Sequence, residues 1–122
     1  MKHIALIDDD MFIRDLVAMK LSGDKYTIAA AGTAKEGLAL LAEQTPDLIL
    51  LDMELPDRHG LDVLEQLKSD ARYSSVPVIV FSNNDDPETQ QKAKAAGAKD
   101  FFVKVSIDMS ELEQQVDDFF ST

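Results

Sequence analysis

The sequence contains no cysteine among its 122 residues. A disulfide framework, a thiolate metal site and a thiol nucleophile are therefore excluded. No apolar run reaches the roughly 18 residues that a membrane-spanning helix needs. The start of the chain, Met1-Lys2-His3, also lacks the layout of a signal peptide. These absences favour a cytoplasmic protein that makes no contact with a membrane.

Basic residues are scarce, because 12 Lys and Arg stand against 23 Asp and Glu, for a formal net charge of −11. Such a charge repels a phosphate backbone, so we expect no direct binding of nucleic acid. Hydrophobic residues make up 45% of the chain and charged residues 29%, as in ordinary globular proteins. We expect residues 1–122 to form one domain, because that length suits one core and not two.

Short apolar segments alternate with segments of helical spacing five times along the chain. The predicted strands cover residues 4–7, 26–30, 48–52, 77–82 and 101–103, and the predicted helices follow them at 11–22, 33–42, 61–68, 87–96 and 109–120. This alternation predicts an α/β fold, with a parallel sheet and helices on both faces. For five strands, the flavodoxin-like doubly wound order 2-1-3-4-5 fits best.

Carboxylates follow two of the predicted strands. The aliphatic run Leu48–Leu51 ends at Asp52, and the first strand ends at Asp8 and Asp9. The predicted order places strands one and three side by side at the switch point of the sheet, where open α/β sheets keep their ligands. We therefore expect the side chains of Asp8, Asp9 and Asp52 to converge there.

Three converging carboxylates need a compensating charge. At an effective dielectric of 20, two of them ~4 Å apart repel by about 4 kcal/mol. Either their pKa values rise or a cation lies among them, and an all-oxygen set favours Mg²⁺ or Mn²⁺ over Zn²⁺. Mg²⁺ commonly binds phosphate as well, and the ends of the last two strands supply the Ser82 hydroxyl and the mobile Lys104 ammonium. Together these groups suit phosphoryl transfer.

The pattern resembles the receiver domain of two-component response regulators over essentially the whole chain. The resemblance is carried by the Asp8-Asp9 pair, by Asp52 and by Gly60, which lies eight residues beyond it. Ser82 after the fourth strand and Lys104 after the fifth complete the motif set.

The resemblance implies a role for each residue of the set. Asp52 would accept a phosphoryl group from a phosphohistidine on a sensor histidine kinase or phosphotransfer protein. Mg²⁺ would bind Asp9 and Asp52 directly, Asp8 through water, and Glu54 through its backbone carbonyl. Ser82 and Lys104 would contact the phosphoryl oxygens.

The same resemblance places Phe101 at the position of a switch aromatic. Neighbouring strand residues face opposite ways, so we expect Phe102 to pack in the core.

Three residues depart from the family pattern. Val105 follows Lys104 where the family usually has a proline joined by a cis bond. A cis non-proline bond costs roughly 3–4 kcal/mol, so we expect a trans bond and an altered loop. Asn83 replaces a small residue and is expected to narrow access to the phosphoryl site. Phe101 lacks the hydroxyl of a tyrosine, so its coupling to Ser82 would be steric.

The main hypothesis is a stand-alone phosphorylation switch that catalyses only its own phosphotransfer and dephosphorylation. With 122 residues we expect no DNA-binding output domain, unless the chain is part of a longer regulator. The signal would then leave through a downstream protein target or a phosphorylation-dependent dimer. One alternative is a haloacid-dehalogenase-like phosphatase, although Glu54 stands where that family has a second Asp. The other alternative is a receiver-like interaction module that is never phosphorylated.

Overall fold

The computed structural model describes residues 1–83, 86–104 and 108–121. Its elements alternate strand and helix along the chain, as predicted. They are β1(Lys2–Ile7), α1(Met11–Leu21), β2(Tyr26–Ala31), α2(Ala34–Glu43), β3(Leu48–Asp52), α3(Gly60–Ser69), β4(Val78–Ser82), α4(Pro87–Ala95), β5(Asp100–Val103) and α5(Met109–Ser121).

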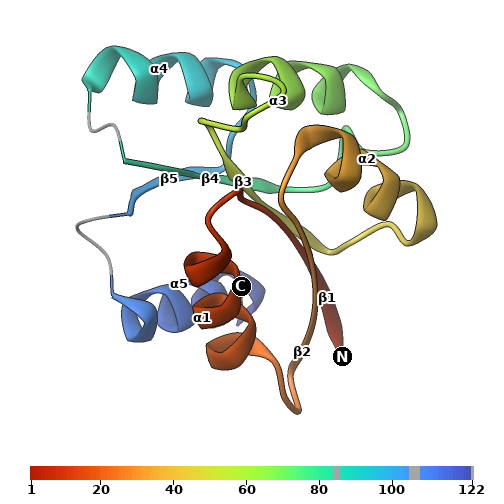
Figure 1. Cartoon of the computed structure of the whole chain (residues 1–122), viewed down its shortest axis with the longest axis vertical. Coiled ribbons are helices and arrows are strands. Elements are labelled where there is room, and N and C mark those ends of the chain that lie inside the picture. Colours follow the sequence, from red (N-terminus) through yellow and green to blue (C-terminus); the bar gives the residue numbers. More distant parts are fainter. Residues whose placement is uncertain (84–85, 105–107, 122) are drawn as a thin grey trace.

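The strands form a parallel sheet in the order β2-β1-β3-β4-β5, which confirms the predicted doubly wound topology. Helices α1 and α5 cover one face of the sheet, and α2, α3 and α4 cover the other (Figure 1). Each face buries its own hydrophobic cluster against these helices. None of the described helices combines the length and the apolar character of a membrane span.

Strand β3 lies in the middle of the sheet and is buried along its whole length. Its side chains alternate between the two faces: Leu48 and Leu50 pack with α1 and α5, whereas Ile49 and Leu51 pack with the other three helices. A strand that is apolar on both faces needs helices on both sides. The aliphatic run Leu48–Leu51 therefore explains why this strand lies in the middle of the sheet and why helices cover both of its faces.

Three of the described helices begin just after polar residues that the sequence indicates as caps. The side chain of Asp10 accepts hydrogen bonds at the start of α1, and that of Asp86 does so just before Pro87 in α4. Thr33 and Glu36 form the predicted capping box of α2, because the Thr33 hydroxyl accepts from the Glu36 N–H and donates to its carboxylate.

The two aromatic residues of β5 face opposite sides of the sheet, as expected. Phe101 is 9% exposed and lies in the cluster under α2, α3 and α4. Phe102 packs edge-to-face on Phe81 on the other side, with ring centroids 5.7 Å apart. Val105, and with it the expected trans bond after Lys104, lies outside the described residues.

Candidate functional site

Three aspartates meet at the carboxyl edge of the sheet. Asp8 and Asp9 follow β1, and Asp52 ends β3, which pairs directly with β1. One carboxylate oxygen from each lies within 4.8 Å of the other two. The convergence predicted from strand order is confirmed.

The three carboxylates differ in their contact with solvent. Asp8 is fully buried and Asp52 is 1% exposed, whereas Asp9 is an exposed residue. The loop that carries Asp8 is tied down, because Asp8 Oδ1 accepts from the Asp10 N–H at 2.9 Å and its backbone carbonyl accepts from Arg14 Nη1 at 2.8 Å. Two buried acids and one exposed acid therefore face a common point.

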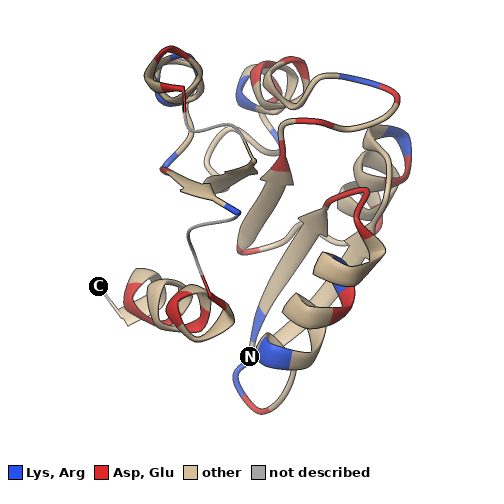
Figure 2. Cartoon of the chain, turned by 60° about the vertical axis from the view of Figure 1, so that its left-hand side comes forward, with Lys and Arg blue, Asp and Glu red and all other residues tan. Residues whose placement is uncertain are grey.

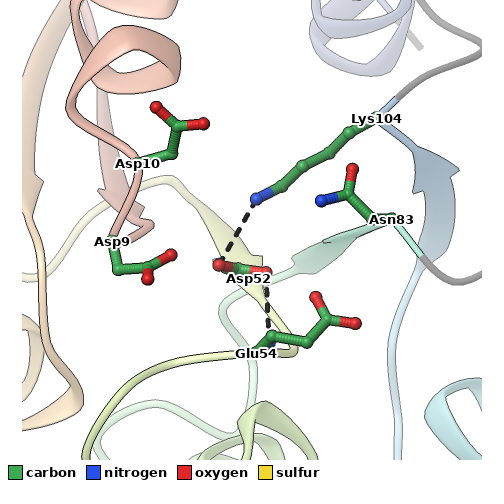
Figure 3. A pocket seen from close by; sticks show the side chains of 6 residues that line it. All are labelled: Asp9, Asp10, Asp52, Glu54, Asn83 and Lys104. Carbon is green, nitrogen blue, oxygen red and sulfur yellow. Dashed lines mark hydrogen bonds and ion pairs between the residues drawn. The ribbon is translucent and has the colours of Figure 1, made fainter.

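Lys104 reaches into this cluster from the end of β5. Its Nζ lies 2.8 Å from Asp8 Oδ2 and 3.3 Å from Asp52 Oδ2, and its side chain is only 8% exposed. Figure 3 shows the extended side chain crossing the pocket toward Asp52. Lys104, which the sequence indicated as a mobile ammonium at this edge of the sheet, is thus a largely buried cation paired with Asp8 and Asp52.

Burial alone would lower the pKa of Lys104, but the contact with Asp8 and the negative charges of Asp52 and Asp8 outweigh it and raise that pKa. The ammonium therefore stays charged, and it partly balances the acidic cluster.

Burial raises the pKa of Asp52 from 3.8 to about 7. The Glu54 N–H, which donates to Asp52 Oδ1 at 3.1 Å, lowers this pKa, and so does Lys104. The charge of Asp8 acts in the opposite direction and raises it. Desolvation has the largest effect on this pKa, so the Asp52 carboxyl group titrates near neutral pH. A further positive charge nearby would stabilise its ionised form.

Ser82 ends β4 with a fully buried side chain next to this cluster. Its hydroxyl donates to Glu54 Oε1 at 2.7 Å. Its backbone carbonyl accepts from the Lys104 N–H at 2.8 Å, which joins the ends of β4 and β5. The serine hydroxyl, the lysine and the three acids predicted from sequence thus belong to one site.

The site opens to solvent through a pocket of about 580 Å³, lined by Asp9, Asp10, Asp52, Glu54, Asn83 and Lys104. The side chains of Glu54 and Asn83 lie on the same side of it (Figure 3). Asn83 is exposed and lines this pocket, and its expected narrowing of access to the phosphoryl site stays a prediction. The volume is ample for a phosphoryl group.

The donor set fits a hard divalent cation. All three candidate ligands are carboxylates, which Mg²⁺ and Mn²⁺ prefer. Asp8 Oδ2 is buried, and the Lys104 ammonium lies 2.8 Å from it. The exposed carboxylate of Asp9 stands at the pocket side of the cluster.

Gly60 allows α3 to begin directly against the end of β3. A Cβ atom at this position would clash with the backbone oxygen of Asp52 and with Cα of Met53. The Gly60 N–H donates to the Met53 carbonyl at 2.7 Å. The glycine of the motif therefore serves close packing of backbone beside Asp52.

Two contacts near the site were not predicted from the sequence. The carboxylate of Asp57, in the loop after β3, accepts from the N–H groups of Ala34 and Lys35 at the start of α2, and these bonds lower its pKa. The side-chain contact of Glu54 with Ser82 was also not expected. Both link residues more than 20 positions apart, so no local pattern could have indicated them.

Comparison with known proteins agrees with this geometry. The family model for the response regulator receiver domain matches residues 4–117. The transcriptional regulatory protein KdpE of the KDP operon of Escherichia coli (strain K12) is 35% identical over 104 residues, which cover 85% of this chain and 45% of KdpE. The chain thus spans less than half the length of that relative.

Solved structures share the fold over nearly the whole chain. The BeF3-activated DrrB receiver domain is 27% identical, with a TM-score of 0.87, and the match covers 100% of this chain and 99% of the other. The phosphorylated cyanobacterial phytochrome response regulator RcpA is also 27% identical, with a TM-score of 0.82 and coverage of 97% and 90%. The chain therefore belongs to the family of response regulator receiver domains, the phosphorylation-switch domains of two-component systems.

Proposed function

We propose that Asp52 accepts a phosphoryl group from the phosphohistidine of a sensor histidine kinase or phosphotransfer protein. The observation that carries this proposal is the convergence of Asp8, Asp9 and Asp52 around one point, with Lys104 Nζ 3.3 Å from Asp52. The match to a phosphorylated regulator of the same fold supports it.

In the proposed transfer, an ionised Asp52 oxygen attacks phosphorus as the phosphorus–nitrogen bond of the phosphohistidine breaks. The imidazole nitrogen leaves with the electron pair of that bond. Lys104 pairs with the phosphoryl oxygens, and the Ser82 hydroxyl donates to them. These groups act by position and charge, as phosphoryl transfer requires.

The carboxylates of Asp9 and Asp52, the backbone carbonyl of Glu54 and, through water, Asp8 would hold Mg²⁺ or Mn²⁺. A bound ion supplies positive charge that neutralises and orients the phosphoryl oxygens. Because the pocket is open to solvent, water can later reach the phosphoaspartate, so the domain would catalyse its own dephosphorylation as well. The domain would turn over no other substrate.

Phosphorylation would act on the protein through the ends of β4 and β5. The added group changes the local charge by about −2 and brings new acceptor oxygens. Ser82 and Lys104, joined through their backbones, would shift toward it. Phe101 lies three residues before Lys104 in β5 and is 9% exposed, and we propose that it responds to this shift by steric contact. We propose that residues 1–122 act as one receiver domain, read by a downstream protein or by a second copy of the chain. A cytoplasmic location stays a prediction.

Incubation with Mg²⁺ and acetyl phosphate, followed by intact-mass measurement, tests the proposal. We expect the gain of one phosphoryl group per chain, lost in Asp52→Asn and retained in Asp24→Asn, whose exposed carboxylate lies outside the pocket. No adduct on the unsubstituted chain would support the unphosphorylated interaction module. Many cycles on a phosphate ester would support a phosphatase.

A further inference from the structure

The hydroxyl of Ser82 is already engaged in this structure. Its Oγ lies 2.7 Å from Glu54 Oε1, and the Ser82 side chain is fully buried. A serine hydroxyl has one proton to donate, and an ionised carboxylate can only accept. While Ser82 donates to Glu54, it cannot donate to another oxygen.

We propose that Glu54 competes with the phosphoryl group for the Ser82 hydroxyl, and so acts as a positioning residue that sets how readily the site takes up phosphate. The proposal rests on the proposed function, because it assumes that Ser82 serves the phosphoryl oxygens. It assigns the Glu54 side chain a role separate from that of its backbone carbonyl.

The position of Glu54 supports competition with the phosphoryl group for the Ser82 hydroxyl. Its side chain lines the same pocket as Asp52, Asn83 and Lys104 (Figure 3). Its backbone N–H is bonded to Asp52, the residue that would carry the phosphoryl group, at 3.1 Å. A dianionic phosphoryl group at Asp52 would meet the Glu54 carboxylate as a like charge and as a rival acceptor at once.

The two partners differ in their freedom to move. Ser82 is held in β4 by sheet pairing and by its carbonyl contact with Lys104, whereas Glu54 is an exposed residue beyond the end of β3. Glu54 can therefore turn into solvent with a smaller loss of buried surface than a movement of Ser82 would cause. Only the form in which Glu54 has released the Ser82 hydroxyl is competent to bind the phosphoryl group. The apparent affinity for the phosphoryl group therefore falls as the Glu54–Ser82 hydrogen bond is present for more of the time.

Affinity for beryllofluoride in the presence of Mg²⁺ measures this competition without a covalent step, and this anion activates the similar DrrB receiver domain. We expect Glu54→Ala to bind it about 10-fold more tightly, which corresponds to about 1.4 kcal/mol. Glu54→Gln keeps an acceptor oxygen but loses the charge, so its affinity should lie between those of Glu54→Ala and the unsubstituted chain. Glu43→Ala removes the same charge from the far end of α2 and should change little.

The decisive comparison repeats the measurement in a Ser82→Ala background. Competition for the hydroxyl predicts that the gain from Glu54→Ala shrinks to about 2-fold or less once the hydroxyl is gone, because coupled residues are not additive. An equal gain in both backgrounds would mean that Glu54 acts by charge alone, and the proposal would be wrong. Absence of any gain from Glu54→Ala would overturn it too.

Urea unfolding without phosphate or metal gives a second measurement that needs no phosphorylation. A double-mutant cycle over Glu54→Ala and Ser82→Ala should show a favourable coupling between the two side chains. Zero coupling would overturn the proposal even if beryllofluoride binds normally. The Glu54–Ser82 coupling could also be intact in a chain that neither binds beryllofluoride nor accepts phosphate. In that case the proposed function is wrong, and competition with a phosphoryl group is wrong as well.

Discussion

At the end of β3, Asp52 has almost no contact with solvent, and this burial outweighs its neighbours in setting its pKa. The nearby ammonium of Lys104 and the Glu54 N–H both favour the ionised form, yet the pKa stays near 7. A carboxylate in this state gains from any further positive charge. Burial of Asp52 therefore favours binding of a cation at the site.

The same burial predicts a pH-dependent cost to stability in metal-free buffer. The folded-state pKa of about 7 lies above the ordinary 3.8, so the folded chain binds more protons between these values, and stability falls as pH rises through that window. Asp52→Asn removes the cost. We expect it to raise the free energy of unfolding at pH 8 by on the order of 2 kcal/mol, given 1.36 kcal/mol per pKa unit and partial relaxation.

Urea unfolding in the presence of a chelator at pH 5 and pH 8 measures this effect. The gain from Asp52→Asn should be clearly smaller at pH 5, where the folded carboxyl group is largely protonated. Asp24→Asn, at an exposed turn, should follow the unsubstituted chain at both values. A gain from Asp52→Asn that is equal at both pH values would show that desolvation of Asp52 does not control stability.

Individual elements follow from local sequence, and for that reason the fold was predictable. The buried run of β3, the caps at Asp10 and Asp86 and the capping box at Thr33 depend on residues within a few positions of each other. Strand order then brought the three aspartates together. The side chains that join separate elements carry no such local pattern.

Three contacts show which features of the site could not be predicted from the sequence. Burial of Lys104 against Asp8, the bond of Glu54 to Ser82 and the cap that Asp57 provides to α2 each depend on how loops approach one another. Residue type indicated that these groups are polar, but not which partner each would take. Their geometry is a property of the packed elements.

The start of α3 gives a test at this scale. Alanine is ordinarily a better helix residue than glycine, so Gly60→Ala would stabilise an unconstrained helix. Here the added methyl group meets backbone of Asp52 and Met53, which cannot move aside as a side chain can. We expect a loss of about 1–3 kcal/mol in the free energy of unfolding, together with weaker beryllofluoride binding because Asp52 is displaced.

Gly32→Ala is a suitable control in the same urea measurement. Its added methyl group would meet the guanidinium end of Arg14, a flexible side chain. We expect a smaller loss than for Gly60→Ala. Equal losses for the two variants would mean that the close backbone contact at Gly60 is not what requires glycine there.

Across the whole molecule, negative charge is in excess on both sides of the sheet. Acidic residues colour helices on both faces in Figure 2, and α5 carries Glu111, Glu113, Asp117 and Asp118 with no basic residue. A net charge of −11 opposes the compact state through self-repulsion. The cluster at the carboxyl edge of the sheet adds three acids at short range, and Lys104 forms ion pairs with two of them, Asp8 and Asp52.

General screening and specific cation binding should therefore both stabilise the fold, and they can be separated. At ten times its dissociation constant, Mg²⁺ bound only to the folded chain adds about 1.4 kcal/mol to the free energy of unfolding. NaCl at matched ionic strength screens the same surface repulsion but does not occupy the site.

Asp9→Asn removes an exposed carboxylate of the cluster without disturbing the core. We expect this variant to keep its response to NaCl and to lose most of the extra response to Mg²⁺ in urea unfolding at pH 7.5. Equal responses of the unsubstituted chain to both salts would show that its acids act as a diffuse charge and that no cation site forms among them.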